Sequence, residues 1–100
     1  MLIIAVTFVL HKEHLASFLD EVLQNAKTSL DSEPGCIRFD VCENSQEYEV
    51  FLYEQYVDDH AFDEIHLKSS HFLDFNEITA PWIAKKSIHR YQLRSEKLVE

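Results

Sequence analysis

The chain has 100 residues, of which 46% are hydrophobic and 12% aromatic, which suffices for one core and leaves too little length for a second domain. Nine Lys and Arg against 18 Asp and Glu give a formal net charge of -9, which repels nucleic acid and anionic membrane surfaces. We therefore expect one domain with neither of these partners. Because an isolated domain of this size is only modestly stable, we also expect a homodimer.

Hydrophobic patterning predicts the first strand and the first helix. Residues 2–10 are almost all apolar and rich in β-branched side chains, which is typical of a strand covered on both faces. This stretch is too short to span a membrane and has no basic flank or cleavage signal, so we expect a cytoplasmic protein. Over residues 11–32, apolar side chains recur every three or four positions, which predicts a helix. Its apolar face comprises Leu15, Phe18, Leu19, Val22, Leu23, Ala26 and Leu30.

A strand is predicted at residues 36–43. The preceding Glu33-Pro34-Gly35 ends the helix, because proline cannot continue it and glycine permits a sharp reversal. Alternation within the strand places its side chains on two faces. One face is predicted to carry Ile37, Phe39 and Val41, and the other Cys36, Arg38, Asp40 and Cys42.

A hairpin and a broken helix are predicted for the middle of the chain. Turn-forming residues at 44–46 connect the strand to a second β-favouring run at 49–56. After this run, Asp58 or Asp59 can cap a short helical segment. A longer helical segment follows a break near residues 69–70.

The order of the elements predicts the fold class. Pro81 ends the helical region, and residues 82–93 return to a β-favouring pattern. The resulting order β-α-β-β-α-β is that of a ferredoxin-like α+β fold, in which helices cover one face of a four-stranded sheet. We assign this domain to residues 1–95 and a C-terminal tail to residues 96–100. A second subunit packed sheet against sheet would cover the other face.

Three segments resemble the antibiotic biosynthesis monooxygenase family. They are residues 33–41 (EPGCIRFDV), residues 51–56 (FLYEQY), and the pair His66 and His71 on either side of two serines. The likeness in order and spacing covers nearly the whole chain. Within the family, these segments are most similar to the branch that contains quinol monooxygenases and the isomerase of phosphorylated autoinducer-2.

The resemblance implies a dimeric αβ barrel in which each subunit holds a cavity between its sheet and its helices. Several members of this family oxidise electron-rich aromatic compounds with O₂ and without a cofactor. Others isomerise a small phosphorylated dione, and the fold alone does not separate these activities.

Two residues are the candidate catalytic pair, Glu54 and His66. Glu54 lies in an apolar strand, where a carboxylate must be paired, hydrogen-bonded or protonated, and it matches the strand glutamate of the family. It can serve as a general base, orient a histidine, or act only as a structural anchor. His66 matches the family position that faces the cavity, and imidazole exchanges protons near neutral pH. We expect His66 and Glu54 to act together.

Metal and cofactor sites are not expected. His66 and His71 are five residues apart, about 140° around a regular helix, so only a break between them would bring both to one point. The sequence shows no third ligand clustered with them. The single glycine provides no phosphate-binding loop, and a cofactor-free reaction fits that absence.

Five residues are candidates for substrate binding. Arg38 and Asp40 share a strand face, where they can form an ion pair or a subunit contact, or Arg38 can hold a phosphate or oxyanion. Tyr56 and Trp82 suit a core or an interface, and Trp82 can also stack on a flat ring. The fifth candidate is His71.

Three functions remain open. In the first, Glu54 and His66 deprotonate a phenol or quinol, and the anion reacts with O₂ inside an apolar cavity. In the second, the same pair isomerises a small phosphorylated hydroxydione held by Arg38. In the third, the protein is a non-catalytic binding or stress protein.

Overall fold

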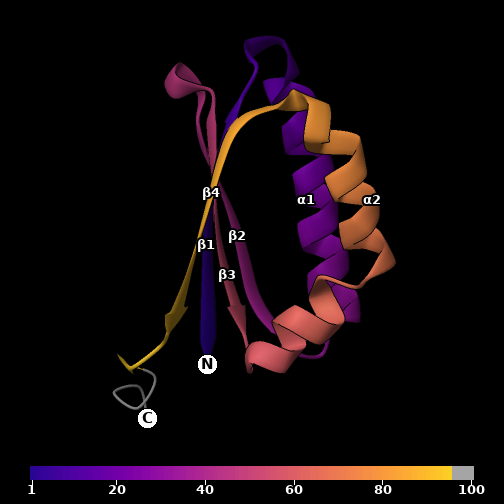
Figure 1. Ribbon diagram of the computed structural model, residues 1–100, viewed down its shortest axis with the longest axis vertical. Coiled ribbons are helices and arrows are strands. Elements are labelled where there is room, and N and C mark those ends of the chain that lie inside the picture. The colour runs from indigo at the N-terminus through magenta and orange to yellow at the C-terminus, as the bar shows by residue number, and fades with distance from the viewer. Residues whose placement is uncertain (96–100) are drawn as a thin grey trace.

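The computed structural model describes residues 1–95, and the predicted tail at residues 96–100 lies outside the described residues. Its elements follow the predicted order β-α-β-β-α-β (Figure 1). A short π-helix, Ala61–His66, precedes the second α-helix. The main elements are β1 (Leu2–Leu10), α1 (Leu15–Ser32), β2 (Cys36–Asn44), β3 (Glu49–Tyr56), α2 (Ser70–Thr79) and β4 (Ile83–Gln92).

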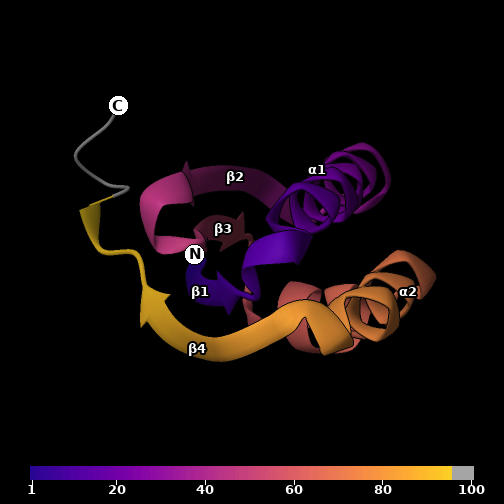
Figure 2. The same ribbon diagram turned by 90° about the horizontal axis from the view of Figure 1, so that it is seen from above.

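The four strands form one antiparallel sheet in the order β2-β3-β1-β4. Figure 2 shows that α1 and α2 lie on the same face of this sheet. The ferredoxin-like α+β fold is thus confirmed. Several boundaries differ by a few residues; for example, Trp82 belongs to a 3-10 turn (Ala80–Trp82), so β4 begins one residue later than predicted and ends at Gln92.

The core lies between the sheet and the helices. Side chains of a strand alternate between its faces, so Ile4, Val6 and Phe8 of β1 point toward α1 and are buried. The fully buried Phe18 of α1 contacts Phe8 and Phe75, with ring centroids 4.9 and 5.7 Å apart. These contacts fix both helices over the centre of the sheet.

A bulge in β2 changes the predicted alternation. The pairing of β2 with β3 shifts register between Cys36 and Arg38, because β2 carries one extra residue there. Cys36 and Phe39 are therefore both buried, whereas Ile37 is 46% exposed. The prediction that Ile37 shares the buried face of Phe39 is wrong for this reason.

The opposite face of the sheet carries no helix among residues 1–95 (Figure 2). Several apolar side chains lie on it, including Ala5 and Tyr53, which are partners across β1 and β3, and the more exposed Phe51 and Tyr91. None of the described helices is both long and apolar enough to cross a membrane.

Candidate active site

A cavity of about 410 Å³ lies between the sheet and the helices. Its walls are mainly apolar and come largely from the inner faces of β1, β3 and β4, from the π-helix and from α2. The polar groups that reach it are few. They are Asn25, Glu54, His66, Asn76, Lys86 and Arg90.

His66 is the last residue of the π-helix and is 2% exposed. The carboxylate of Asp58 accepts a hydrogen bond from the backbone N–H of Ala61 at 2.8 Å and so caps the helical turn that begins at Asp59 and leads into the π-helix, as the sequence predicted. The imidazole ring stacks on Phe62 and contacts Phe72, with centroids 5.7 and 5.1 Å away. Aromatic packing therefore holds His66 in a fixed orientation at the cavity wall.

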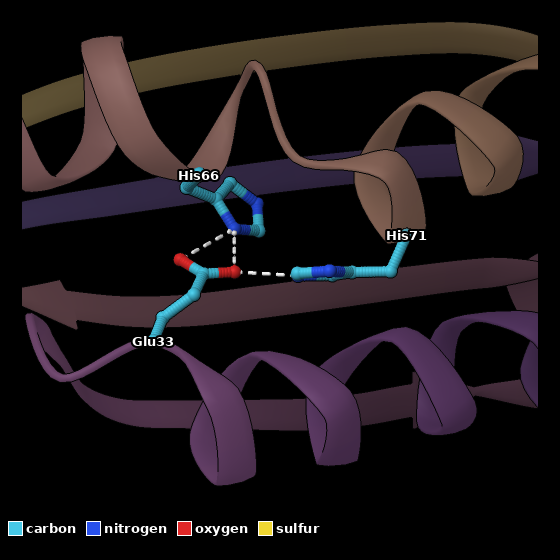
Figure 3. A group of neighbouring side chains, drawn as sticks. All are labelled: Glu33, His66 and His71. Carbon is cyan, nitrogen blue, oxygen red and sulfur yellow. Dashed lines mark hydrogen bonds and ion pairs between the residues drawn. The ribbon is translucent and has the colours of Figure 1, made fainter.

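Glu33 is the hydrogen-bond partner of His66. It directly follows α1 and is 5% exposed, and its Oε2 lies 3.0 Å from Nδ1 of His66 (Figure 3). Sequence reasoning treated Glu33 only as part of a helix stop. A signal for its role was present, because Val22, Ala26, Ser29 and Glu33 follow at steps of four, three and four on the buried face of α1.

Gly35 brings these two segments together. A Cβ atom at Gly35 would lie 2.5 Å from the Cβ of Ala61, so only glycine permits this approach of the α1–β2 turn to the π-helix. The backbone N–H of Val57 also donates to the carbonyl of Gly35 at 2.9 Å. The close approach sets Glu33 beside His66.

His71 completes the cluster from the start of α2. Ser69 caps this helix, accepting a hydrogen bond from the backbone N–H of Phe72 at 3.3 Å. Nε2 of His71 lies 2.5 Å from Oε2 of Glu33 (Figure 3). The break between the two helical segments therefore brings His66 and His71 together, as the sequence analysis allowed.

Burial and hydrogen bonding shift the pKa values of the two buried glutamates, Glu33 and Glu54, in opposite directions. Burial raises the pKa of Glu33, but hydrogen bonds and charge from His66, with hydrogen bonds from His71 and Ser29, outweigh it and bring the pKa below its usual value. Burial dominates at Glu54 and raises its pKa, although the hydroxyl of Tyr56 donates to Oε1 of Glu54 at 2.6 Å. Glu33 is thus the ionised partner and Glu54 the one that favours its protonated form.

The predicted pair of His66 and Glu54 faces each other without a direct hydrogen bond. Nε2 of His66 lies 4.0 Å from Oε1 of Glu54, a distance that leaves room for a small group to bridge them. Both residues line the cavity. The pairing expected from the sequence is therefore incomplete, since the direct partner of His66 is Glu33.

None of the five predicted substrate-binding residues lines this cavity. Arg38 and Asp40 lie on the opposite sheet face, where Nε of Arg38 donates to Oδ2 of Asp40 at 2.7 Å. Trp82 stacks on His14, with centroids 5.6 Å apart. Tyr56 is fully buried behind Glu54, and His71 lines a separate groove between α1 and α2.

Two cations that the sequence analysis did not single out line the cavity instead. The guanidinium group of Arg90 in β4 forms ion pairs with the carboxylates of Asp63 and Asp59, at N···O distances of 2.7 and 3.3 Å. Lys86 has no ion pair among the described residues, and its ammonium lies 5.4 Å from the ring centroid of Phe8. Because strand residues alternate, Lys86 and Arg90 share the inner face of β4.

Glu33, His66 and His71 are also the described residues that could hold a metal ion. One potential ligand atom from each lies within 4.8 Å of the other two. The third ligand that the sequence analysis did not find is therefore Glu33. It was missed because it lies 33 residues from His66 along the chain.

Residues 1–78 match the family model described as antibiotic biosynthesis monooxygenase. The chain belongs to the antibiotic biosynthesis monooxygenase family. This confirms the resemblance found in the sequence at the level of the family. A search of curated proteins found no match to this family member.

Solved structures share the fold of this family member. A protein of Nitrosomonas europaea is 23% identical with a TM-score of 0.86, over 93% of this chain and 98% of that chain. A protein of Caulobacter crescentus is 19% identical with a TM-score of 0.87, over 93% and 89% of the two chains. Both carry the family name as a provisional assignment. A Pseudomonas aeruginosa protein is 24% identical, with a TM-score of 0.81 over 93% and 94%.

Proposed function

We propose that this protein is a cofactor-independent monooxygenase that acts on a small phenol or quinol, as in the quinol monooxygenase branch of its family. The observation that carries this proposal is the position of His66. Its Nδ1 is held by the ionised Glu33, while its Nε2 lies toward Glu54 at the cavity. Such an arrangement suits a general base.

The Glu33–His66 contact fixes which nitrogen can accept a proton. A carboxylate accepts a hydrogen bond, so Nδ1 of His66 carries the hydrogen and the lone pair is left on Nε2. When Nε2 takes a proton from a substrate hydroxyl, the negative charge of Glu33 stabilises the imidazolium. Glu33 is therefore a positioning residue, and His66 is the catalytic base.

Glu54 supports the reaction from β3, on the sheet side of the cavity. Because burial raises its pKa, its protonated form is favoured and can donate a hydrogen bond to the substrate oxygen. Tyr56 donates to Oε1 of Glu54, which keeps the carboxyl group in place. The 4.0 Å separation of His66 and Glu54 lets one oxygen atom contact both.

The reaction balances without an external reductant. His66 removes the hydroxyl proton, and the electron-rich anion forms a carbon–oxygen bond with O₂ to give a hydroperoxide. Loss of water breaks the O–O bond, so that one oxygen atom stays on carbon as a carbonyl and the other leaves with two substrate hydrogens. The apolar walls limit competing reactions of the intermediates with water.

A second candidate is the isomerase of a small phosphorylated hydroxydione. Lys86, a cavity cation without an ion pair among the described residues, favours an anionic substrate. The acid–base groups His66 and Glu54 would then move a proton between carbon and oxygen atoms. In this version Lys86 takes the role that the sequence analysis gave to Arg38.

We further propose a cytoplasmic homodimer formed by residues 1–95 as one domain. The helix-free sheet face carries Phe51 and Tyr91, 36% and 55% exposed. Burial of these side chains against a second sheet would stabilise the assembly.

Oxygen uptake by purified, metal-stripped protein separates the candidate functions. The assay uses a panel of quinols and anthrone-like phenols, followed by phosphorylated diones. The proposal predicts uptake with at least one phenol or quinol and loss of that uptake in Glu54→Leu, whose side chain cannot donate a hydrogen bond to the substrate oxygen. Conversion of a phosphorylated dione without uptake would assign the isomerase, and binding without turnover would assign a binding protein.

A further inference from the structure

Glu33, His66 and His71 present one carboxylate oxygen and two imidazole nitrogens to a common point (Figure 3). Glu33 Oε2 lies 3.0 Å from Nδ1 of His66 and 2.5 Å from Nε2 of His71. Zinc bonds of about 2.0–2.2 Å at tetrahedral angles separate ligand atoms by roughly 3.4 Å, so a movement of about 1 Å admits an ion. We propose that these three residues bind a divalent transition-metal ion of the Zn²⁺ class.

The donor atoms select the class of ion. Imidazole nitrogen suits Zn²⁺ and its transition-metal neighbours, whereas Mg²⁺ and Ca²⁺ prefer all-oxygen sites. Glu33 and His66 are almost fully buried, whereas His71 is more exposed and lies closest to the carboxylate, so His71 makes the larger part of this movement. Three protein ligands leave one coordination position for water.

A groove of about 300 Å³ between α1 and α2 gives an ion access to the cluster, because His71 lines it. Glu21 and Asp74 line the same groove, and their carboxylates favour the entry of a cation. Asn25 also lines it, and its buried Oδ1 has no hydrogen-bond partner among the described residues. Such an unpaired acceptor is suited to a water molecule on the metal.

Metal binding would switch off the base proposed above. A metal bound to Nδ1 of His66 uses the lone pair on that nitrogen, so the ring hydrogen must move to Nε2. Nε2 then faces Glu54 as a donor and cannot accept a proton from substrate. Metal binding and base catalysis are therefore mutually exclusive, and this second step rests on the proposed function.

Binding is tested first, without substrate, on the untagged protein. Co²⁺ is titrated while its visible absorption is recorded, and Zn²⁺ is titrated by calorimetry. We expect one ion per chain with the absorption of a four-coordinate site. His71→Ala, at the rim, should weaken binding by at least about 100-fold, whereas His60→Ala, an exposed histidine, should leave it unchanged.

The readouts separate the two parts of this inference. Zn²⁺ should raise the Tm of the wild type but not of His71→Ala, and circular dichroism shows whether the variant is folded. No saturable binding, or equal binding by folded His71→Ala, would overturn the site. Zn²⁺ should abolish the proposed monooxygenase activity in proportion to occupancy. Full activity at full occupancy would overturn the coupling, while the binding result stands by itself.

Discussion

Oε2 of Glu33 lies 3.0 Å from Nδ1 of His66, although the two residues are 33 positions apart in the sequence. The contact joins the end of α1 to the π-helix and places an ionised carboxylate behind the cavity histidine. We propose that this contact fixes the tautomer of His66 and leaves its Nε2 free to act as the base.

Glu33→Gln tests this role. The amide has no charge to stabilise the imidazolium, so we expect kcat for the phenol or quinol to fall by about 100-fold or more. KM should change little, because Glu33 does not line the cavity. Steady-state kinetics provide the measurement, with the exposed Glu77→Gln as the matched control. A kcat within twofold of the wild type would remove Glu33 from the mechanism.

The buried carboxyl of Glu54 should limit stability at high pH. Its pKa is raised by burial, so the folded state holds this proton more tightly than the unfolded chain does. The resulting stability is complete below the unfolded pKa of about 4.3 and is lost as pH rises through the folded pKa.

Glu54→Gln removes that loss while its amide oxygen can still accept from Tyr56. We expect the Tm of the variant at pH 8 to exceed that of the wild type by several degrees, which corresponds to a gain on the order of 1 kcal/mol in the free energy of unfolding. The difference should shrink at pH 4. Thermal unfolding at both pH values measures it. A variant less stable than the wild type at pH 8 would show that the ionised form of Glu54 is not disfavoured.

The helix-free sheet face should form the dimer interface. Phe51→Glu places a charge on β3, one of the two inner strands of the sheet, so we expect the dimer to dissociate into monomers, as measured by analytical ultracentrifugation. Leu23→Glu, on the helix α1 and 53% exposed, is the matched control and should remain dimeric. The interface is assigned wrongly if Leu23→Glu dissociates and Phe51→Glu does not.

Cys36 should be unreactive in the folded protein. Burial first, and then the nearby carboxylates, raise the pKa of its thiol to about 12, and the thiolate is the reactive form. In the Cys42→Ser variant, a thiol reagent at pH 8 should label Cys36 only after unfolding in guanidinium chloride. Rapid labelling of the native variant would contradict the packing at the β2 bulge.

The sequence was sufficient to predict elements that follow a simple period. The apolar run of β1 and the three- and four-residue steps of α1 gave bounds close to those observed. Ile37 was misplaced because a bulge arises from pairing with β3, and no local pattern marks it. Family resemblance identified His66 and Glu54, both of which line the cavity.

The remainder of the site depends on contacts that cross the fold. For Arg38 the sequence left open an ion pair with Asp40, a subunit contact and a role in holding a phosphate; alternation along β2 directs it to the opposite face, where it pairs with Asp40. Lys86 reaches the cavity because β4 pairs with β1 at the sheet edge. Glu33 meets His66 only after Gly35 allows the turn to approach Ala61. None of these relationships follows from spacing along the chain.

The most direct test of the account is oxygen uptake by metal-stripped His66→Ala with the best phenol or quinol substrate, beside wild type and the exposed control His60→Ala. We predict that wild type and His60→Ala consume oxygen at equal rates and that His66→Ala falls by at least about 100-fold. Uptake by folded His66→Ala at the wild-type rate would contradict the claim that His66 generates the reactive anion.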